Sequence, residues 1–254
     1  MGSDHAHRLY VPGASVVHRL GPQCKLVATV AFVILVVLTP ARQMWAFALY
    51  ALVLAVVAAV AHIPAPTIAR RMLVEVPFVV FALAMPFLTP GDRVEVAGIQ
   101  LSSAGLWSAW NVLAKATVGV VTSILLAATT DLRMLLLGLE RLRLPGLLVQ
   151  IMTFMVRYSD VITDEMRRMR IARLARGFEA RDIRSLPVLA HSAGALFIRS
   201  YERGERVHLA MLSRGYTGSM PSVVDIAAPT RDWALALALP AVAIVILTAA
   251  RVSA

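Results

Sequence analysis

The sequence predicts an all-α, polytopic membrane protein with about five transmembrane helices and a cytoplasmic region of three amphipathic helices. The first observation is composition: of 254 residues, 59% are hydrophobic and only 16% are charged, with a mean hydropathy of +0.73. Such a chain is too apolar for an ordinary soluble domain of this length, and the composition excludes disorder. The other two observations are the length of the apolar segments and the distribution of arginines between them.

Five segments are candidates for spanning helices, because a helix needs about 20 mostly apolar residues to cross a membrane. The second segment carries no charge at all, whereas the third contains Glu75 and two prolines, and the fourth contains Lys115. Proline is tolerated in a span where neighbours satisfy the freed backbone groups, with kinks as the result. The expected spans are about 26–38, 44–61, 72–89, 105–127 and 233–250.

The basic residues give the expected topology. Lysines and arginines outnumber acidic residues by 25 to 15, and fifteen of the arginines lie in 128–230. In a soluble protein this excess would suggest nucleic acid, but beside apolar spans it favours loops that stay in the cytoplasm. We therefore expect no nucleic-acid partner. Residues 1–127 are predicted as an N-terminal transmembrane region, 128–230 as a cytoplasmic region, and 231–254 as a C-terminal transmembrane helix that ends outside the cell membrane.

The cytoplasmic region is predicted to contain three amphipathic helices in succession. The first covers 131–145. The second begins near Gly146 with a mainly apolar stretch of thirteen residues, too short to span, and continues without a break to an Arg-Gly pair. Asp164 and Arg168 have the spacing of an acid-to-base pair on one helix face.

The third helix is expected after Ser185, a residue suited to an N-cap, with Pro187 in its first turn. Glu202 and Arg206 repeat the acid-to-base spacing, and the segment again ends in an Arg-Gly pair.

Two interpretations of these Arg-Gly ends stay open from the residues alone. Arg176 precedes Gly177, and Arg214 precedes Gly215. A glycine is an ordinary C-terminal cap of a helix, and an arginine in the last turn interacts favourably with the helix dipole. Alternatively, two guanidinium groups at helix tips could enter acidic grooves of a soluble partner, since guanidinium binds carboxylates in a bidentate manner.

Three stretches make the chain resemble the transmembrane T component of energy-coupling-factor (ECF) transporters, and most closely the cobalt-type CbiQ subfamily. The first is "SVVHRLGPQCKL", before the first span. The second is "LERLRLPGLLVQIMTFMVRYSDVITDEMRRMRIARLARGF", and the third is "ALFIRSYERGERVHLAMLSRGYTG". The resemblance covers nearly the whole chain, and its specificity lies in the second and third stretches together.

The resemblance implies a division of labour in which this chain is a non-catalytic subunit. Two ATPase subunits would hydrolyse ATP, an S component similar to CbiM would bind cobalt or nickel, and the T component would join them within the lipid membrane. It also implies that the two Arg-Gly motifs close coupling helices and dock on the ATPases. Serine replaces the common alanine in the second motif. The implied coupling residues are Ala175, Arg176, Gly177, Ser213, Arg214 and Gly215.

Other functional patterns are weak. His5 and His7 suit a metal such as cobalt but lack a third ligand at a defined spacing, so we interpret them as a solvated tail. We expect no metal ligand and no cofactor in this chain. Charged residues within spans are candidates for function, but Glu75 and Lys115 lie roughly 13 Å apart in depth at 1.5 Å per residue, which disfavours a pair. Lys115 is expected to face protein. The single cysteine, Cys24, excludes an intramolecular disulfide, and no cleavable signal peptide is expected.

Three alternative functions stay open. Within the same class, the substrate could be a vitamin such as biotin, riboflavin or folate. An integral membrane enzyme acting on a phosphorylated lipid would use the cytoplasmic arginines, and a self-sufficient channel would need no partner. The sequence contains no G-x-x-x-x-G-K-[ST], G-x-S-x-G or H-E-x-x-H pattern. The chain is therefore not expected to be the ATPase, and an enzymatic function has little support.

Overall fold

The computed structural model of the chain divides into two compact units. The bundle unit comprises 9–138 and 226–254, and the α9–α10 unit comprises 1–8 and 139–225. The structure describes residues 9–90, 92–96, 99–179, 182–218 and 228–253.

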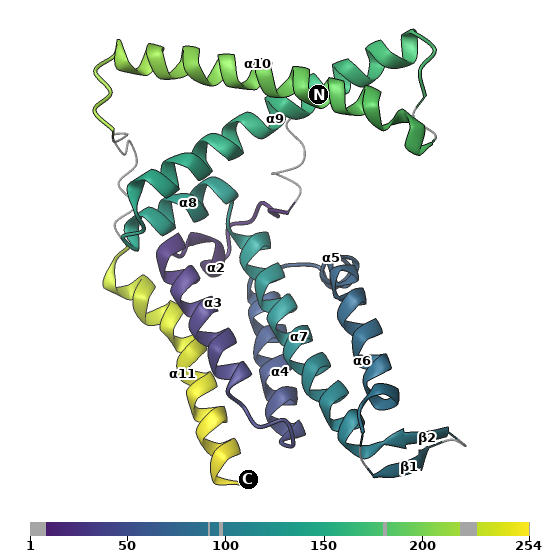
Figure 1. Ribbon diagram of the computed structural model, residues 1–254. Helices are drawn as coiled ribbons and strands as arrows, with labels where there is room; N and C mark the ends of the chain where they lie inside the picture. The colour runs from purple at the N-terminus through teal and green to yellow at the C-terminus, as the bar shows by residue number, and fades with distance from the viewer. Residues whose placement is uncertain (1–8, 91, 97–98, 180–181, 219–227, 254) are drawn as a thin grey trace. The chain divides into compact units, whose positions relative to one another are not determined.

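Almost all of the described chain is helical (Figure 1). The elements of the bundle unit are α2 (Val16–Arg19), α3 (Pro22–Val37), α4 (Met44–Val60), α5 (Ala65–Arg71), the 3₁₀ helix η1 (Met72–Glu75), α6 (Val76–Leu88), β1 (Arg93–Val96), β2 (Ile99–Ser102), α7 (Ser103–Thr129) and α11 (Thr230–Val252). Helix α8 (Leu132–Arg141) crosses the boundary between the units, and α9 (Gly146–Ala175), η2 (Ile183–Ser185) and α10 (Leu186–Leu212) complete the second unit.

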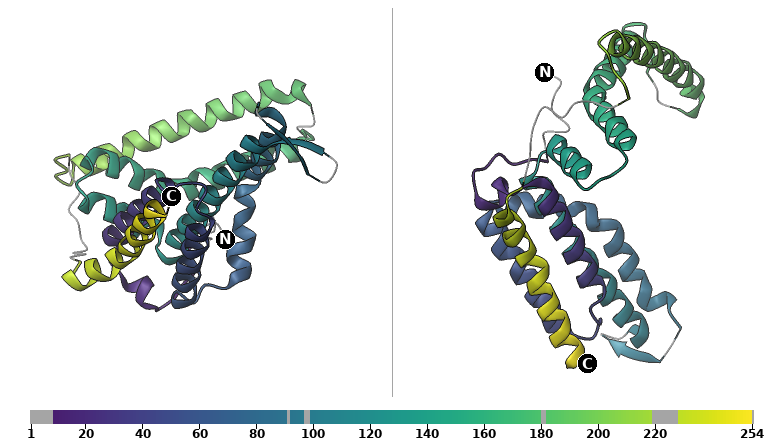
Figure 2. Two further views of the ribbon diagram at one scale, coloured as in Figure 1. Left: turned by 90° about the horizontal axis from the view of Figure 1, so that it is seen from below. Right: turned by 90° about the vertical axis from the view of Figure 1, so that its left-hand side faces the viewer.

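The long helices of the bundle unit run side by side and alternate in direction (Figures 1 and 2). Among the described residues, three helical segments are long and apolar enough to cross a membrane: Ala65–Leu88, α7 and α11. Helices α3 and α4 are apolar but shorter, with 16 and 17 residues. The prediction of an all-α polytopic membrane protein is confirmed.

The third span differs from its prediction in length and regularity. The sequence placed it at 72–89, whereas the helical segment begins at Ala65 and is interrupted by the 3₁₀ turn η1. The interruption ends at Glu75, two residues before Pro77, whose ring removes a backbone donor and restricts the preceding turn. A regular α-helix therefore begins only at Val76.

A β-hairpin that the sequence analysis missed connects α6 to α7. Strand β1 pairs with β2 in antiparallel register, with Arg93 opposite Ser102. The two helices then pack very closely: a Cβ on Gly105 would lie 2.6 Å from the Cα of Pro86. Glycine is therefore needed here for backbone approach, and the side chain of Ser102 caps α7 by accepting the Gly105 amide at 3.3 Å.

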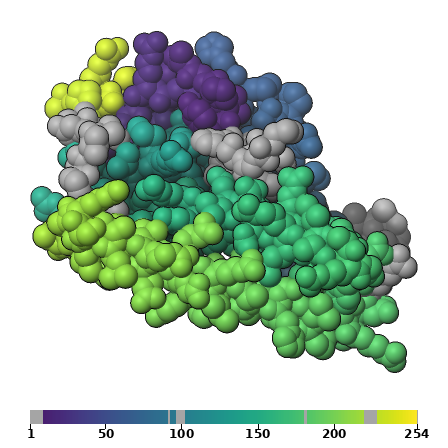
Figure 3. Space-filling view, turned by 90° about the horizontal axis from the view of Figure 1, so that it is seen from above, coloured from purple at the N-terminus to yellow at the C-terminus, as the bar shows by residue number. Residues whose placement is uncertain are grey.

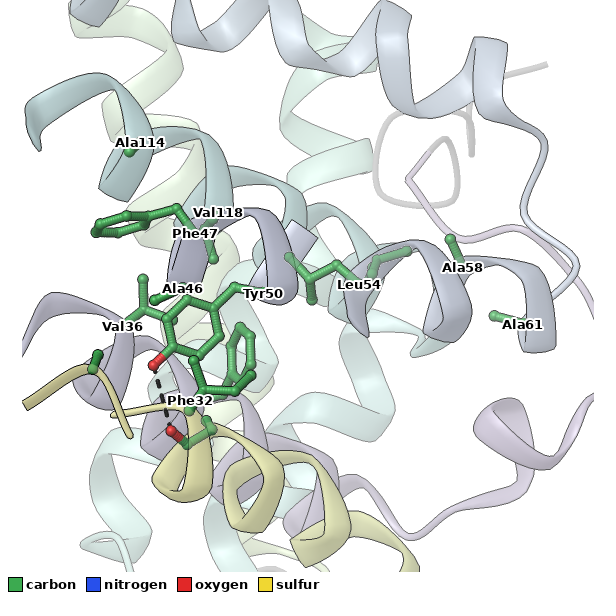
Figure 4. Close-up of a cluster of buried hydrophobic side chains, with 14 of the residues drawn as sticks. Phe32, Val36, Ala46, Phe47, Tyr50, Leu54, Ala58, Ala61, Ala114 and Val118 are labelled. Atoms are coloured by element: carbon green, nitrogen blue, oxygen red, sulfur yellow. Dashed lines mark hydrogen bonds between the residues drawn. The ribbon is translucent and has the colours of Figure 1, made fainter. Parts of the chain in front are cut away.

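The core of the bundle unit lies where α3, α4, α7 and α11 meet (Figure 4). Tyr50 is fully buried and its hydroxyl contacts Thr39 Oγ1 at 3.0 Å and the Ala243 carbonyl at 3.4 Å. Its ring packs edge-on against Phe32, with centroids 5.7 Å apart. Small residues such as Ala46 fill the remaining contacts, which allows helix backbones to approach as they do within membranes.

The outer surface of the bundle unit is apolar. Leu83, Phe87 and Leu88 on α6 expose 64%, 66% and 76% of their surface. A contiguous apolar patch of this kind on an isolated soluble domain would promote aggregation. Its presence on a span-length helix is what contact with lipid acyl chains requires.

Candidate functional site

The second predicted amphipathic helix is a single element, α9, of 30 residues. It begins directly after Pro145, which cannot donate a backbone hydrogen bond and suits the start of a helix. The mainly apolar stretch at its beginning and the arginines at its end belong to one continuous helix, as predicted. Helix α10, of 27 residues, follows η2, with Pro187 in its first turn as expected, although the Ser185 side chain makes no cap hydrogen bond.

Helix α9 ends in a Schellman motif centred on Gly177. The Phe178 amide donates to the Arg173 carbonyl at 3.0 Å, and the Gly177 amide donates to the Leu174 carbonyl at 2.9 Å. Gly177 has φ of 74°, the left-handed conformation that this motif requires and that glycine adopts without strain. Arg176 is thus the last residue before the chain reverses.

Helix α10 ends in the same motif. The Tyr216 amide donates to the Met211 carbonyl at 3.0 Å, the Gly215 amide donates to the Leu212 carbonyl at 3.0 Å, and Gly215 has φ of 82°. Ser213, the residue that departs from the family's alanine, turns its hydroxyl back to the Ala210 carbonyl at 3.0 Å. Because that hydrogen bond stays within the helix, the serine leaves the shape of the helix end unchanged.

Arg176 and Arg214 are exposed, and neither forms an ion pair within the described part of the chain. Helix α10 connects the two tips and is about 40 Å long at 1.5 Å per residue. Two unpaired guanidinium groups, each held at a rigid helix end, can bind carboxylates of another protein. The coupling role of Ala175 to Gly177 and of Ser213 to Gly215 stays a prediction.

Three other arginines of the unit, Arg168, Arg199 and Arg206, pair with a carboxylate on their own helix or on the crossing helix. Arg206 pairs with Glu202 at 3.8 Å, as the spacing predicted. The predicted pair between Asp164 and Arg168 is wrong, because Arg168 approaches Glu165 instead, at 3.5 Å. Spacing alone permits either carboxylate, whereas Glu165 is fixed beside the crossing helix.

Two contacts that the sequence analysis missed join α9 to α10. Arg199 on α10 donates a hydrogen bond to Glu165 on α9. Beyond the end of α10, the Tyr216 hydroxyl donates to the Gln150 side-chain oxygen at 2.7 Å. Tyr216 directly follows the capping glycine, at the position whose side chain often packs back on the helix. That position is the local feature of the sequence that could have indicated a contact for Tyr216.

The stacked rings of Phe154 and Tyr158 line two grooves between α9 and α10. One groove, of about 200 Å³, is lined by Ile162 and Leu196 among others, and a second, of about 460 Å³, is lined by Met211 and Tyr216. Helix α10 also exposes large apolar side chains, with Phe197 71% exposed, and Figure 3 shows its side chains uncovered along the viewed face.

The charged residues of the spans occupy different environments. Glu75 is only 4% exposed and accepts a hydrogen bond from Thr117 on α7, while no ion pair joins it to Lys115 in the described chain. Lys115 is half-buried on α7. His5 and His7 lie outside the described residues, and among those described no group of three or more His, Cys, Asp or Glu side chains could hold a metal ion.

Comparisons with known proteins place the chain in a family. The family model described as a cobalt transport protein, CbiQ, matches residues 13–223, which include both helix tips. The chain is an ECF transporter T component of the CbiQ family. It is 29% identical over 223 residues to the energy-coupling factor transporter transmembrane protein EcfT of Bacillus selenitireducens, a match that covers 82% of each chain.

Further relatives carry the same description. The EcfT protein of Staphylococcus aureus is 28% identical over 231 residues, covering 83% of each chain. That of Bacillus subtilis is 26% identical over 226 residues, covering 82% of this chain and 83% of the relative. These matches make this T component a transport subunit rather than an enzyme.

Proposed function

We propose that this T component joins two ATPase subunits to a substrate-binding S component and transmits the motion of the ATPases through α9 and α10. The observation that carries the proposal is the matched pair of Schellman ends. Each presents an exposed arginine, Arg176 or Arg214, without an ion pair in the described chain. A single helix end of this kind would be an ordinary C-terminal cap. Two helix ends with the same geometry, in a subunit of a transporter, fit two equivalent ATPase subunits.

The separation of the tips supports a contact with each ATPase. Arg176 and Arg214 end different helices, and about 40 Å of helix α10 lies between these ends. A single small groove could not take both guanidinium groups, whereas two copies of one subunit could each take one. Guanidinium–carboxylate contacts are strong and directional, which suits a joint that must carry movement. For ATP to drive movement, these contacts must differ between the two states of the ATPases.

The distribution of arginines supports a cytoplasmic position for 128–230. Helices α2 and α5, whose last residues include Arg19, Arg70 and Arg71, lie at the end of the bundle unit to which α8 is attached (Figure 1). The hairpin β1–β2, which begins at Arg93, and the C-terminal end of α11, which includes Arg251, lie at the opposite end (Figure 1). The segment 128–230, which follows α7 in the chain, contains fifteen further arginines, and basic flanks stay in the cytoplasm. The cell membrane is the compartment that this topology implies, with the transmembrane regions at 1–127 and 231–254.

Cobalt or nickel is the proposed substrate class, and it rests on the family description rather than on any residue of this chain. The alternative is a vitamin such as biotin, riboflavin or folate. The relatives named EcfT leave this alternative open, because their name specifies an energy-coupling factor and no substrate. In both cases the S component would select the substrate, and this chain would join it to the ATPases in the same way.

The test is reconstitution with defined partners. The chain would be co-expressed with an ATPase pair and an S component of the same genome and purified as a complex. The complex would then be placed in liposomes with ATP enclosed, because an importer moves substrate toward the side of its ATPases. We expect ATP-dependent uptake of labelled Co²⁺ or Ni²⁺, and none with the chain alone. Uptake of a labelled vitamin instead would support the alternative, and flux through liposomes that contain only this chain would overturn the coupling function.

A further inference from the structure

The N-terminal stretch "SVVHRLGPQCKL" takes no part in the helix tips, yet it concentrates buried polar contacts. We name residues 11–25 the N-terminal clasp. Lys25 is only 6% exposed, and its ammonium group donates to the Thr129 carbonyl at 3.0 Å and to the His18 carbonyl at 3.4 Å. No carboxylate pairs with it in the described chain. A buried ammonium is costly, so its position calls for an explanation.

Two hydrogen bonds from the clasp satisfy backbone carbonyls at the C-terminal end of α7. Lys25 satisfies the Thr129 carbonyl, one of the last carbonyls of the helix, where a positive charge also opposes the helix dipole. The Val11 amide donates to the neighbouring Ala128 carbonyl at 2.9 Å. Val11 is itself held by the His18 ring, whose Nε2 lies 3.0 Å from the Val11 carbonyl.

The same segment contacts α8 and α11. A Cβ on Gly138 of α8 would lie 3.0 Å from the Gln23 amide nitrogen, so the two backbones are in close contact. The Gly21 amide donates to Asp232 Oδ2, in the first turn of α11, at 3.1 Å. A Cβ on Gly21 would also lie only 3.0 Å from the Cβ of Ala228, just before α11.

These contacts lie on the end of α7, on Gly138 of α8 and at the start of α11, all within the bundle unit. The chain leaves the bundle unit after Gly138 and returns at Ile226. We propose that the N-terminal clasp holds the end of α7, Gly138 of α8 and the start of α11 as one block, so that motion of the α9–α10 unit moves α7 and α11 together. Lys25 and Asp232 are then positioning residues. The inference rests on the proposed coupling function.

The first test removes one contact at a time from the assembled complex. Asp232→Ala deletes the acceptor of the Gly21 amide, and Asp232→Asn is the matched control because its amide oxygen still accepts. Allosteric coupling typically changes a property by about fivefold or more, so we expect substrate uptake per ATP hydrolysed to fall by at least about fivefold in Asp232→Ala and in Lys25→Met. Asp232→Asn should retain the wild-type ratio, and ATP hydrolysis and assembly should persist in all three.

A disulfide tests whether the connection between the clasp and the start of α11, rather than the carboxylate of Asp232 itself, maintains the ratio of uptake to hydrolysis. In a Cys24→Ala background, Gly21→Cys and Ala228→Cys would place their Cβ atoms close to the 3.5–4.5 Å found in disulfides, after a shift of a few tenths of an ångström. Oxidation should restore the ratio of uptake to hydrolysis in Asp232→Ala, and reduction should abolish it again.

Two results would contradict the proposed role of the clasp and leave the coupling function intact. One is a wild-type ratio of uptake to ATP hydrolysis in Asp232→Ala and Lys25→Met, and the other is a lowered ratio in Asp232→Ala that the disulfide does not restore. Failure of the coupling function itself would appear differently, as an absence of ATP-dependent uptake by the wild-type complex.

Discussion

Arg176 and Arg214 owe their position to the glycine that follows each of them. Gly177 and Gly215 reverse the chain at positive φ, so the preceding arginine stands at the helix tip. The sequence predicts this feature well because the cap is local, with an arginine, a glycine and an amphipathic helix all in one stretch. Arg143 also adopts a positive φ, of 61°, beyond the end of α8, where no glycine signals the reversal. That end could not be predicted from residue type.

Gly177→Ala and Gly215→Ala should loosen the last turns of α9 and α10. An L-residue in the left-handed region costs about 1–2 kcal/mol, and the cap hydrogen bonds would weaken accordingly. Hydrogen exchange of the amides of Phe178 and Tyr216 in the purified chain would measure the effect. Gly204→Ala, inside α10 with open space around the added Cβ, is the control and should slightly stabilise its helix. Equal exchange in all three variants would contradict the role of the capping glycines.

Glu165 and Glu75 show where residue-level prediction stops. Asp164 and Glu165 are both spaced to reach Arg168, and the choice of Glu165 depends on Arg199 from the crossing helix. The difference in depth along the spans disfavours Lys115 as a partner of Glu75, but it does not predict the burial of Glu75 against Thr117. Both outcomes depend on contacts between elements, which the spacing of residues along one helix does not contain.

For helices α6 and α7, too, the sequence predicts the elements but not the contacts between them. The apolar segments predicted that both helices exist, because about 20 apolar residues leave few alternatives. The hairpin between them, and the closeness of their packing at Gly105, were not predicted. Strands β1 and β2 have only four residues each, too few to show a clear alternation, and they pair with each other rather than with a larger sheet.

Gly105→Ala should destabilise the α6–α7 pair. The added Cβ would meet backbone atoms of Met85 and Pro86 within 2.8 Å, and backbone cannot move aside as a flexible side chain can. Overpacking of this kind costs about 1–3 kcal/mol. Thermal unfolding in detergent would show it as a lower Tm. Gly119→Ala on the same helix, with nothing within 4 Å of the added Cβ, is the matched control, and an equal Tm for the two variants would argue against close packing at Gly105.

Because the bundle unit has an odd number of apolar helical segments, its first helix begins at one end of the unit and its last helix ends at the other. Because α3, α4, the α5–α6 segment, α7 and α11 alternate in direction, the start of α3 and the end of α7 lie at one end of the bundle unit, and the end of α11 lies at the other (Figures 1 and 2). Composition and the count of apolar segments predicted this arrangement. They could not predict the N-terminal clasp, whose contacts join residues separated by as many as 211 positions along the chain.

Thiol labelling tests the topology. In a Cys24→Ala background, a membrane-impermeant maleimide applied to intact cells should label Ser253→Cys at the C-terminal end. It should reach Ala14→Cys and Thr217→Cys only after the cells are opened, because arginine-rich flanks stay in the cytoplasm. All three native residues are exposed, so their accessibility to reagent is comparable. Labelling of Ala14→Cys from outside would reverse the assigned orientation.

We propose that Arg176 and Arg214 together connect this T component to its ATPases. The most direct measurement is ATP-dependent uptake by the complex that carries Arg176→Ala and Arg214→Ala together, with co-purification of the ATPases measured in parallel. Arg206→Ala is the control, since that guanidinium pairs with Glu202 on its own helix. A hydrogen bond to a charged group contributes about 1.5–3 kcal/mol, so losing one guanidinium should weaken binding by about tenfold or more. We predict that the double variant loses the ATPases or hydrolyses ATP without uptake, whereas an intact complex with normal uptake would contradict the account.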